Sequence, residues 1–260
     1  MEERKNRNME TIRKPFQGVV NIIRFNWHFY VMAIALVILL VLIAGNFNIS
    51  LQLTIYLVCI LISGSTFISL LTSLYIYDLS GLYELKWIDQ HKNEKIIINI
   101  NAGFDETSEL LQTKFKKAEL IALDFYDPKK HTEVSIKRAR EAYPPFPKTK
   151  QIQTSDLQLE SNSADKIFVI LSAHEIRDEN ERIAFFKELT RVIKPSGQIY
   201  VTEHLRDVFN FLAYNIGFFH FYTKGSWVRN FKNAELTIQR EIKLTPFIST
   251  FILTKNGNTY

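Results

Sequence analysis

Two long apolar runs that contain no charged residue constrain this chain more than any other feature. Residues 29–45 read FYVMAIALVILLVLIAG, and residues 51–77 form a second uncharged run after the short link NFNIS. An α-helix rises 1.5 Å per residue, so about 20 residues cross the roughly 30 Å hydrocarbon layer of a bilayer. The second run spans this layer easily, and the first does so with its flanks. We therefore predict a transmembrane helical hairpin over residues 29–77.

The charge around the hairpin indicates its orientation. Residues 1–28 are predicted to form a basic cytoplasmic segment, because their Lys and Arg residues outnumber the acidic ones, whereas the NFNIS turn has neither Lys nor Arg. Basic flanks stay on the cytoplasmic side. We expect a two-pass protein of the inner (cytoplasmic) membrane with both termini cytoplasmic and the lipid bilayer as a partner. The net charge of +5 is otherwise spread thinly among acidic residues, which argues against nucleic acid as a partner.

The apolar runs fit a soluble helix pair or a signal peptide less well than a membrane hairpin. A pair of buried soluble helices is disfavoured because the rest of the chain supplies its own core, and a cleaved signal peptide is disfavoured because a second apolar run follows at once. Aromatic residues at both ends of the hairpin fit an interfacial belt: Trp27, Tyr30, Tyr75, Tyr77 and Trp87. The only cysteine, Cys59, lies within an apolar run and is expected to pack there. Residues 78–95 then form a juxtamembrane linker.

The remaining residues, 96–260, alternate between strand and helix patterns. Apolar strands are expected at residues 95–100, 119–125, 151–156, 166–172 and 198–204, with helices at 106–115, 132–143 and 179–193 and a turn at 194–197. Apolar strands that alternate with helices form a parallel sheet covered on both faces. The last two strand patterns, within residues 235–257, can pair as an antiparallel hairpin. We predict a doubly wound, mostly parallel seven-stranded α/β sheet with an antiparallel terminal hairpin, preceded by the two transmembrane helices.

Residues that follow the strands are the candidates for a ligand site, because ligands of doubly wound sheets lie beyond the carboxyl ends of the strands. Gly103 follows the first strand and permits close backbone approach, with Asp105 or Thr107 able to cap the next helix. Asp124 ends the second strand, where a carboxylate commonly binds ribose hydroxyls. Asp156 follows the third strand, where it can accept a hydrogen bond from an exocyclic amine.

The stretches ALDFYDP, TSDLQLESNSADKIFVILSAHEI and FFKELTRVIKPSGQIYVTEH resemble the class I S-adenosylmethionine-dependent methyltransferases of the type 11 group. The resemblance covers roughly residues 95–255 and implies S-adenosylmethionine as the cofactor. It implies that Asp124 and Phe125 contact the ribose and that Asp156 and Leu157 contact the adenine. The loop residues Asn99, Asn101, Ala102 and Gly103 would then hold the rest of the cofactor.

The first motif departs from the family pattern. The family has an acidic residue followed by GxGxG, and the matching positions here are Asn99, Asn101, Gly103 and Asp105, so only the central glycine is present. An asparagine cannot supply charge near the sulfonium, although Asn101 tolerates positive φ better than most residues. This departure keeps a second hypothesis open, in which the domain is a non-catalytic, membrane-bound interaction or scaffold module.

Methyl transfer from a sulfonium is an in-line displacement, so the protein mainly positions the reactants and supplies a base where the acceptor requires one. After the fourth and fifth strands we expect His174, Glu175 and His204 to be catalytic. Four further residues are predicted to bind substrate: Arg177, Glu203, Arg206 and His220. For either catalytic histidine a purely structural hydrogen bond is the alternative. No metal site is predicted.

Three neighbouring features have simpler expectations. Asp178 is expected to cap the helix that begins at residue 179, and Trp227 is expected to pack in the core. The aromatic insert at residues 209–221 is either a lid over an apolar substrate, with His220 pointing inward, or a core helix. Together the patterns predict a membrane-anchored methyltransferase that acts on a small or lipophilic acceptor at the cytoplasmic face.

Overall fold

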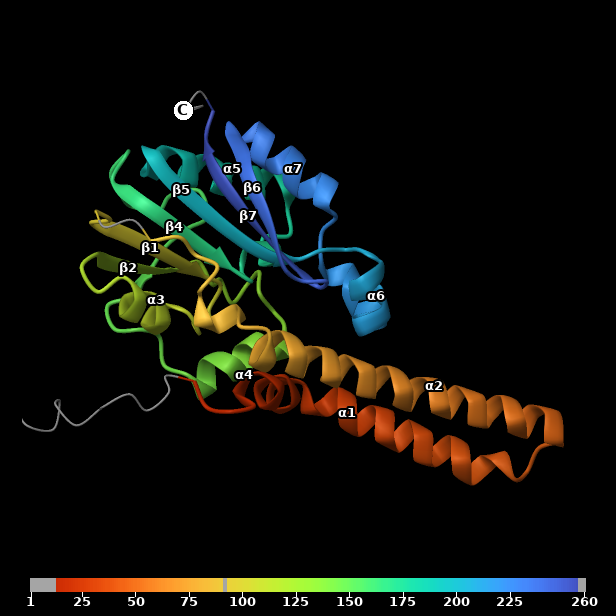
Figure 1. The fold of residues 1–260 in the computed structure, drawn as a ribbon. Coiled ribbons are helices and arrows are strands. Elements are labelled where there is room, and N and C mark those ends of the chain that lie inside the picture. Colours follow the sequence, from red (N-terminus) through yellow and green to blue (C-terminus); the bar gives the residue numbers. More distant parts are fainter. Residues whose placement is uncertain (1–12, 91–92, 257–260) are drawn as a thin grey trace, which may run out of the picture.

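A helical hairpin projects from an α/β domain in the computed structural model, which describes residues 13–90 and 93–256 (Figure 1). Helix α1 (Gln17–Ala44) pairs with helix α2 (Ile49–Leu74), and two short helical turns, η1 (Tyr75–Leu79) and η2 (Leu82–Glu84), lead into the domain. Both long helices are long and apolar enough to cross a membrane, and only 6% of the most apolar window of each is buried. Their side chains therefore lack the protein neighbours that a soluble core helix has.

Helix α1 begins earlier than the sequence pattern indicates. Residues 17–28, assigned above to a basic segment, are helical, and the backbone leaves helical geometry at Asn26 (φ −113°, ψ 17°). The Asp78 carboxylate accepts hydrogen bonds from the N–H groups of Gly18 and Val19, both at 2.8 Å, and so caps the helix start. Because an acidic group at a helix N-terminus pairs with unsatisfied amides, a distant part of the chain stabilises these first turns. The segment before Asn26 packs on the α/β domain.

The seven-stranded sheet has the order β3-β2-β1-β4-β5-β7-β6. Its strands are β1 (Ile96–Asn101), β2 (Glu119–Asp124), β3 (Lys150–Gln151), β4 (Ala164–Ile170), β5 (Ile193–His204), β6 (Leu236–Thr245) and β7 (Ile248–Lys255). All neighbours are parallel except β7, which is antiparallel to both β5 and β6. The predicted doubly wound sheet with a reversed terminal hairpin is confirmed. The strand order reverses between β1 and β4, which is where such sheets bind ligands.

Alternate residues of the central strands fill two apolar layers. Ile98 and Ile100 pack with the side chains of helices α5 (Glu179–Val192) and α7 (Lys224–Asn233) on one face. Ile97 and Phe168 face the other layer, which helix α3 (Ser108–Lys114) and the linker residue Leu85 cover. The period-two alternation of a strand sends neighbouring side chains to opposite faces, so both faces of the parallel strands are apolar. The core thereby holds the carboxyl ends of β1, β4 and β5 in fixed positions.

Two predicted boundaries are wrong. The third strand is limited to Lys150 and Gln151, because the chain turns back into an isolated bridge between Gln153 and Asp156. Residues 194–197, predicted as a turn, lie inside β5, where the pairing with β4 shifts register. Gly197 allows this irregularity, because a Cβ atom there would lie 2.9 Å from the carbonyl oxygen of Asp165. The strand bulges at this glycine instead of ending.

The aromatic insert does not cover the sheet as a core helix. It forms helix α6 (Val208–Tyr214) and the turn η4 (Asn215–His220), and it exposes Phe209, Ile216 and Phe219. Helix α6 contacts α2, so these apolar side chains lie next to the projecting hairpin. Two of the predicted belt residues also pack on the domain, since Trp87 lies beside Tyr200 and Tyr77 contacts His204.

Three smaller expectations are confirmed. Asp178 caps α5 by accepting a hydrogen bond from the N–H of Glu181 at 2.8 Å. Trp227 is fully buried, and Cys59 is buried within the hairpin.

Candidate functional site

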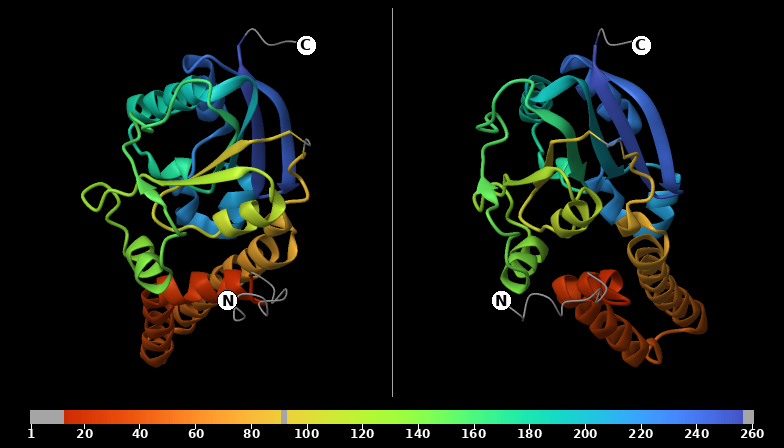
Figure 2. Two further views of the ribbon diagram at one scale, coloured as in Figure 1. Left: turned by 90° about the vertical axis from the view of Figure 1, so that its left-hand side faces the viewer. Right: turned by 60° about the vertical axis from the view of Figure 1, so that its left-hand side comes forward.

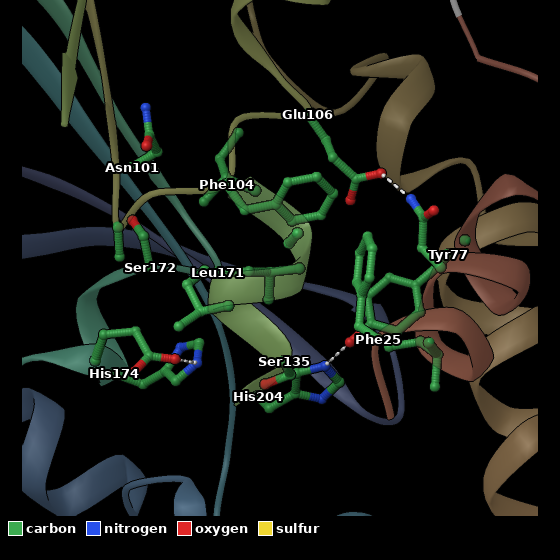
Figure 3. Close-up of a pocket in the computed structure, with 18 of the residues that line it drawn as sticks. Phe25, Tyr77, Asn101, Phe104, Glu106, Ser135, Leu171, Ser172, His174 and His204 are labelled. Carbon is green, nitrogen blue, oxygen red and sulfur yellow. Dashed lines mark hydrogen bonds and ion pairs between the residues drawn. The ribbon is translucent and has the colours of Figure 1, made fainter. Parts of the chain in front are cut away.

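A cavity of about 260 Å³ lies at the carboxyl ends of β1, β4 and β5, and we call it the inner cavity (Figure 3). The loop after β1 forms one wall through Asn101, Ala102 and Phe104, and the turn after β4 forms another through Ser172 and His174. The first turns of α1 and helix α4 (Val134–Ala142) close it from the side of the hairpin, and both views of Figure 2 place these two helices together below the sheet. The cavity therefore occupies the switch point of the sheet.

Asparagine amides hold the loop that departs from the glycine pattern. Gly103 has φ +97°, and the Asn101 side-chain oxygen accepts a hydrogen bond from the Gly103 N–H at 2.9 Å. The Asn101 amide nitrogen donates to the Leu123 carbonyl, which ties the loop to β2. Asn99 is buried, and its amide nitrogen donates to the hydroxyls of Thr107 (2.9 Å) and Ser108 (2.8 Å) at the start of α3. The loop keeps a ligand-binding shape with a single glycine because these amides fix its backbone.

Asp105 works with Asn99 in the same loop. Its Oδ1 atom accepts hydrogen bonds from the N–H groups of Thr107 and Ser108, so it caps α3, and it lies 3.2 Å from the Asn99 amide nitrogen. The other carboxylate oxygen of Asp105 and the amide oxygen of Asn99 are buried and have no hydrogen-bond partner among the described residues. Buried polar atoms of this kind favour a bound polar ligand, because an unsatisfied acceptor is costly.

The predicted ribose carboxylate is at the expected place and already has a partner. Asp124 is 4% exposed, and it accepts hydrogen bonds from the N–H of Tyr126 at 2.8 Å and from Nη1 of Arg140 at 2.6 Å. The Arg140 guanidinium also donates to the Gly103 carbonyl at 3.2 Å and lies 4.3 Å from the centre of the Tyr126 ring. Arg140 thus covers Asp124, and a ribose can reach the carboxylate only when this half-exposed side chain moves.

The remaining predicted cofactor residues lie away from the inner cavity. Phe125 packs in the core against Phe185 and borders a separate surface cavity beside Tyr126. Asp156 is exposed and accepts a hydrogen bond from the N–H of Gln158, and Leu157 is buried with its N–H donating to Glu188. Neither Asp156 nor Leu157 lines the inner cavity.

Four of the predicted side chains meet in one cluster. His174 lies on the turn η3 (Ala173–Glu175), where its Nδ1 is 2.6 Å from the fully buried Glu203 carboxylate and its Nε2 is 3.3 Å from Glu175. His220 contacts the same Glu175 oxygen at 3.4 Å. Burial opposes a charge on His174, but Glu203 and Glu175 together raise its pKa to about 10. His174 therefore keeps its proton at neutral pH and is not a general base in this state.

The predicted substrate residue Glu203 acts behind His174 and does not line the cavity. Burial raises the pKa of Glu175, but hydrogen bonds from His174 and His220 outweigh it and hold that pKa well below its ordinary value. The cluster thus presents the ionised carboxylate of Glu175 at the wall of the cavity. Negative charge there complements a cationic ligand such as a sulfonium.

His204 differs from His174 in protonation. Its Nδ1 lies 3.0 Å from the Asn210 amide oxygen, and its Nε2 lies 2.9 Å from the Tyr77 hydroxyl at the cavity wall. Because the Asn210 oxygen only accepts, Nδ1 carries the hydrogen, and Nε2 accepts from Tyr77. Burial lowers the pKa of His204 to about 4. His204 is therefore neutral at physiological pH, and of the two histidines predicted to be catalytic it is the one whose Nε2 lone pair accepts a hydrogen bond and can take up a proton.

The two predicted arginines hold the turn η4. Arg177 donates to the His220 carbonyl at 2.7 Å, and Arg206 donates to the Phe219 carbonyl at 2.5 Å. Neither arginine lines the inner cavity. Their position supports η4, which brings His220 to Glu175.

Several cavity residues were not predicted from the sequence. Glu106 accepts hydrogen bonds from Arg13 (2.7 Å), Asn21 (3.4 Å) and the Tyr83 hydroxyl (2.7 Å). These partners come from the N-terminus, α1 and η2, so their meeting depends on tertiary structure. The one local signal was the position of Glu106 next to Asp105 in the ligand loop. Through this carboxylate the start of the hairpin is fastened directly to the loop.

A second, larger cavity of about 1180 Å³ adjoins the inner one, and we call it the outer cavity. Its walls include Phe29 and Tyr30 of α1, Ser65 and Ser69 of α2, and the turn η4. The two cavities share lining residues, including Ile22, Asn26, Tyr77, Glu133, Ser135 and Phe221. The site at the switch point thus adjoins a space between the two long helices.

Comparison with known proteins shows which proteins this chain is similar to. The family model described as "Methyltransferase domain" matches residues 99–201. This segment is similar to that family. Among solved structures, an O-methyltransferase family 2 protein from Planctomyces limnophilus is 10% identical, with a TM-score of 0.51 over 74% of this chain and 61% of that one. The fold is that of the class I methyltransferases.

Two further structures are S-adenosylmethionine-dependent methyltransferases. The one from Methanosarcina mazei is 16% identical over 64% of this chain and 94% of that one, with a TM-score of 0.47. The one from Clostridium acetobutylicum is 13% identical over 63% and 85%, with a TM-score of 0.46. No curated protein matches the chain.

The match to the methyltransferase family model supports S-adenosylmethionine as the cofactor. Only glycine fits at position 103 of the loop, because a Cβ atom there would lie 2.8 Å from Nη1 of Arg140 and 3.0 Å from Tyr126. The orphaned acceptors of Asn99 and Asp105 and the carboxylate of Asp124 add polar atoms near the same loop.

Proposed function

We propose that this protein is a membrane-anchored S-adenosylmethionine-dependent methyltransferase that acts on a small or lipophilic acceptor at the cytoplasmic face. The observation that carries the proposal is that the inner cavity, at the switch point of the sheet, shares lining residues with the outer cavity between α1 and α2. An acceptor dissolved in a bilayer reaches the site through the outer cavity without crossing water. Anchoring also raises the frequency of encounter with such an acceptor.

The membrane assignment rests on the exposed apolar surface. Side chains of α1 and α2 such as Met32, Leu42 and Ile60 are more than 60% exposed, and the exposed residues of α6 and η4 continue this surface. Apolar patches of this extent favour a lipid environment. With both termini on the cytoplasmic side of the inner membrane, the methyltransferase domain lies in the cytoplasm next to the bilayer.

Different residues of the chain are proposed to bind the cofactor and to transfer a proton. Gly103, Asp124 and the amide-fixed loop are proposed to hold the cofactor, which supplies an electrophilic methyl group on a sulfonium. The Glu175 carboxylate at the cavity wall offsets the positive charge, and the apolar walls from Phe25, Phe104 and Leu171 exclude water. For an acceptor that loses a proton, the Tyr77 hydroxyl passes it to the neutral Nε2 of His204, 2.9 Å away.

The second candidate function is a non-catalytic membrane-bound scaffold with a methyltransferase-like domain. The contact between Arg140 and Asp124 favours the scaffold function, because Arg140 occupies the carboxylate that would bind ribose. Replacing Asn101 and Asp105 by glycine does not test this idea well, since both side chains hold the loop by hydrogen bonds. Substitutions of Arg140 and Asp124 test it better, because they change the contact between these two residues.

Calorimetric titration of the full-length protein in lipid nanodiscs with S-adenosylmethionine tests the proposal. We expect one cofactor per chain in the natural protein, tighter binding in Arg140→Gln and at least tenfold weaker binding in Asp124→Asn. The control Asp127→Asn changes a nearby carboxylate whose Oδ1 only accepts from the backbone of Lys129, and it should bind as the natural protein does. A folded natural protein and a folded Arg140→Gln variant that both fail to bind at millimolar cofactor would refute catalysis and support the scaffold.

A further inference from the structure

The His174 cluster has the ligand set and spacing of a metal site. The ligand atoms of His174, Glu175 and His220 all lie within 4.8 Å of one another. Nε2 of His174 is 3.3 Å, and Nε2 of His220 is 3.4 Å, from the same oxygen of Glu175. With bonds of about 2.1 Å, a tetrahedral zinc ion separates neighbouring ligand atoms by about 3.4 Å. The two measured edges match this separation.

A carboxylate also contacts Nδ1 of each histidine, on the opposite side of the ring from Nε2. Nδ1 of His174 lies 2.6 Å from the buried Glu203, and Nδ1 of His220 lies 3.2 Å from Glu133. Histidines that bind metals commonly donate their other ring N–H to a carboxylate, which fixes the ring and raises its basicity. We propose that His174, Glu175 and His220 bind a divalent transition metal of the zinc class, with Glu203 and Glu133 as the outer carboxylates.

The proposed site is of the open kind. His174, Glu175 and Glu133 line the inner cavity, so the fourth position of a tetrahedral ion faces the space where an acceptor would lie. Three protein ligands and one open position are typical of catalytic zinc, whereas structural zinc is closed by four protein ligands. The open position suits water or an oxygen atom of a ligand.

One cation competes for the site. Nη2 of Arg177 lies 3.0 Å from Nε2 of His220 and also contacts Nδ1 of the same ring. The Arg177 side chain is 44% exposed, so it can turn into solvent when a metal ion takes its place. Arg177 must leave this position before a metal ion binds His220.

Metal titration of the full-length protein, stripped with a chelator and kept free of S-adenosylmethionine, tests the proposal. We expect Zn²⁺ to bind with one-to-one stoichiometry by calorimetry and Co²⁺ to give the visible absorption of a tetrahedral ion. His220→Ala should abolish the Co²⁺ absorption, and the half-exposed outer residue Glu133→Gln should weaken binding by about 10–100-fold. His28→Ala, a histidine outside the cluster, should bind as the natural protein does.

Failure of the folded natural protein to bind one Zn²⁺, or equal binding by His220→Ala, would overturn the site. An equal loss in His28→Ala would place the metal elsewhere and also overturn it. The outcome does not depend on methyl transfer, because no cofactor or acceptor is present in the assay.

Discussion

At the scale of single residues, Gly103 is the position where the ligand loop tolerates least change. Its φ of +97° is one that side chains rarely adopt, and a Cβ atom there would lie 2.8 Å from Nη1 of Arg140. We expect Gly103→Ala to lower the free energy of unfolding by at least about 1–2 kcal/mol and to weaken cofactor binding. Thermal unfolding and calorimetry measure the two effects.

Gly225→Ala is the matched control for this prediction. Gly225 lies in the first turn of α7, and the nearest atom to an added Cβ would be the Thr223 hydroxyl at 3.9 Å. The control should lose no stability, since alanine favours helix. If Gly103→Ala were as stable as this control and bound the cofactor as well as the natural protein, the loop would have no special backbone requirement.

His204 should make stability depend on pH. Burial lowers its pKa to about 4 from an ordinary value of 6.5. Above about pH 6.5 the histidine is neutral in both the folded and unfolded states, whereas between about 6.5 and 4 only the unfolded state takes up the proton. Its contribution to stability is therefore complete above pH 6.5 and falls as the pH drops towards 4, by up to about 3 kcal/mol.

Comparing the natural protein with His204→Gln isolates this contribution. Unfolding temperatures measured from pH 8 to pH 4 should fall less steeply for the variant within the window from 6.5 to 4. Parallel curves for the two proteins would show that the native His204 titrates normally.

At the scale of elements, the first turns of α1 depend on Asp78. This carboxylate accepts from the N–H groups of Gly18 and Val19, and Arg138 of α4 donates to the Phe25 carbonyl next to the kink, at 2.7 Å. We expect Asp78→Asn to cost about 1 kcal/mol and to speed hydrogen exchange in residues 17–25. The control Asp89→Asn removes a carboxylate that is 55% exposed and pairs with Arg240, and should leave exchange in α1 unchanged.

The elements show what the sequence could predict and what it could not. Hydrophobic periodicity located the parallel strands and their helices, because each buries a face whose period is visible locally. It misplaced the start of α1, because Asp78 lies far along the chain from Gly18. Residues 194–197 look like a turn, but their pairing with β4 keeps them in a strand. In both places hydrogen bonds between residues far apart in the sequence determine the structure.

The sequence likewise predicted some residues of the candidate site and missed others. Asp124, Gly103 and the two histidines predicted to be catalytic lie at or just after the ends of strands, so their positions could be predicted from strand order. Arg140 and Glu133 reach the site from α4, and Glu106 meets Arg13 and Asn21 only in the folded chain. No local pattern marks such partners. The protonation of His174 and the neutrality of His204 also depend on neighbours brought in by folding.

At the scale of the whole molecule, the three tryptophans report on different parts of the proposed membrane arrangement. Trp27 lies in α1 and is 51% exposed, whereas Trp227 lies in α7 and is fully buried in the core. Trp87 packs beside Tyr200, and its indole N–H donates to the Leu82 carbonyl at 2.9 Å. In a bilayer that surrounds the hairpin, only Trp27 is within reach of the acyl chains.

Single-tryptophan variants, with the other two replaced by phenylalanine, separate these positions. In vesicles with brominated acyl chains we expect strong fluorescence quenching of Trp27 and little quenching of Trp87 or Trp227, because bromine quenches at short range. Unfolding temperatures close to that of the natural protein would confirm that each variant is folded. Quenching of Trp227 equal to that of Trp27 would mean that the domain itself enters the bilayer, and no quenching of Trp27 would refute the anchor. The same vesicles with bromine placed at different depths then locate the kink at Asn26 relative to the lipid headgroups, which decides whether the outer cavity opens into the acyl region.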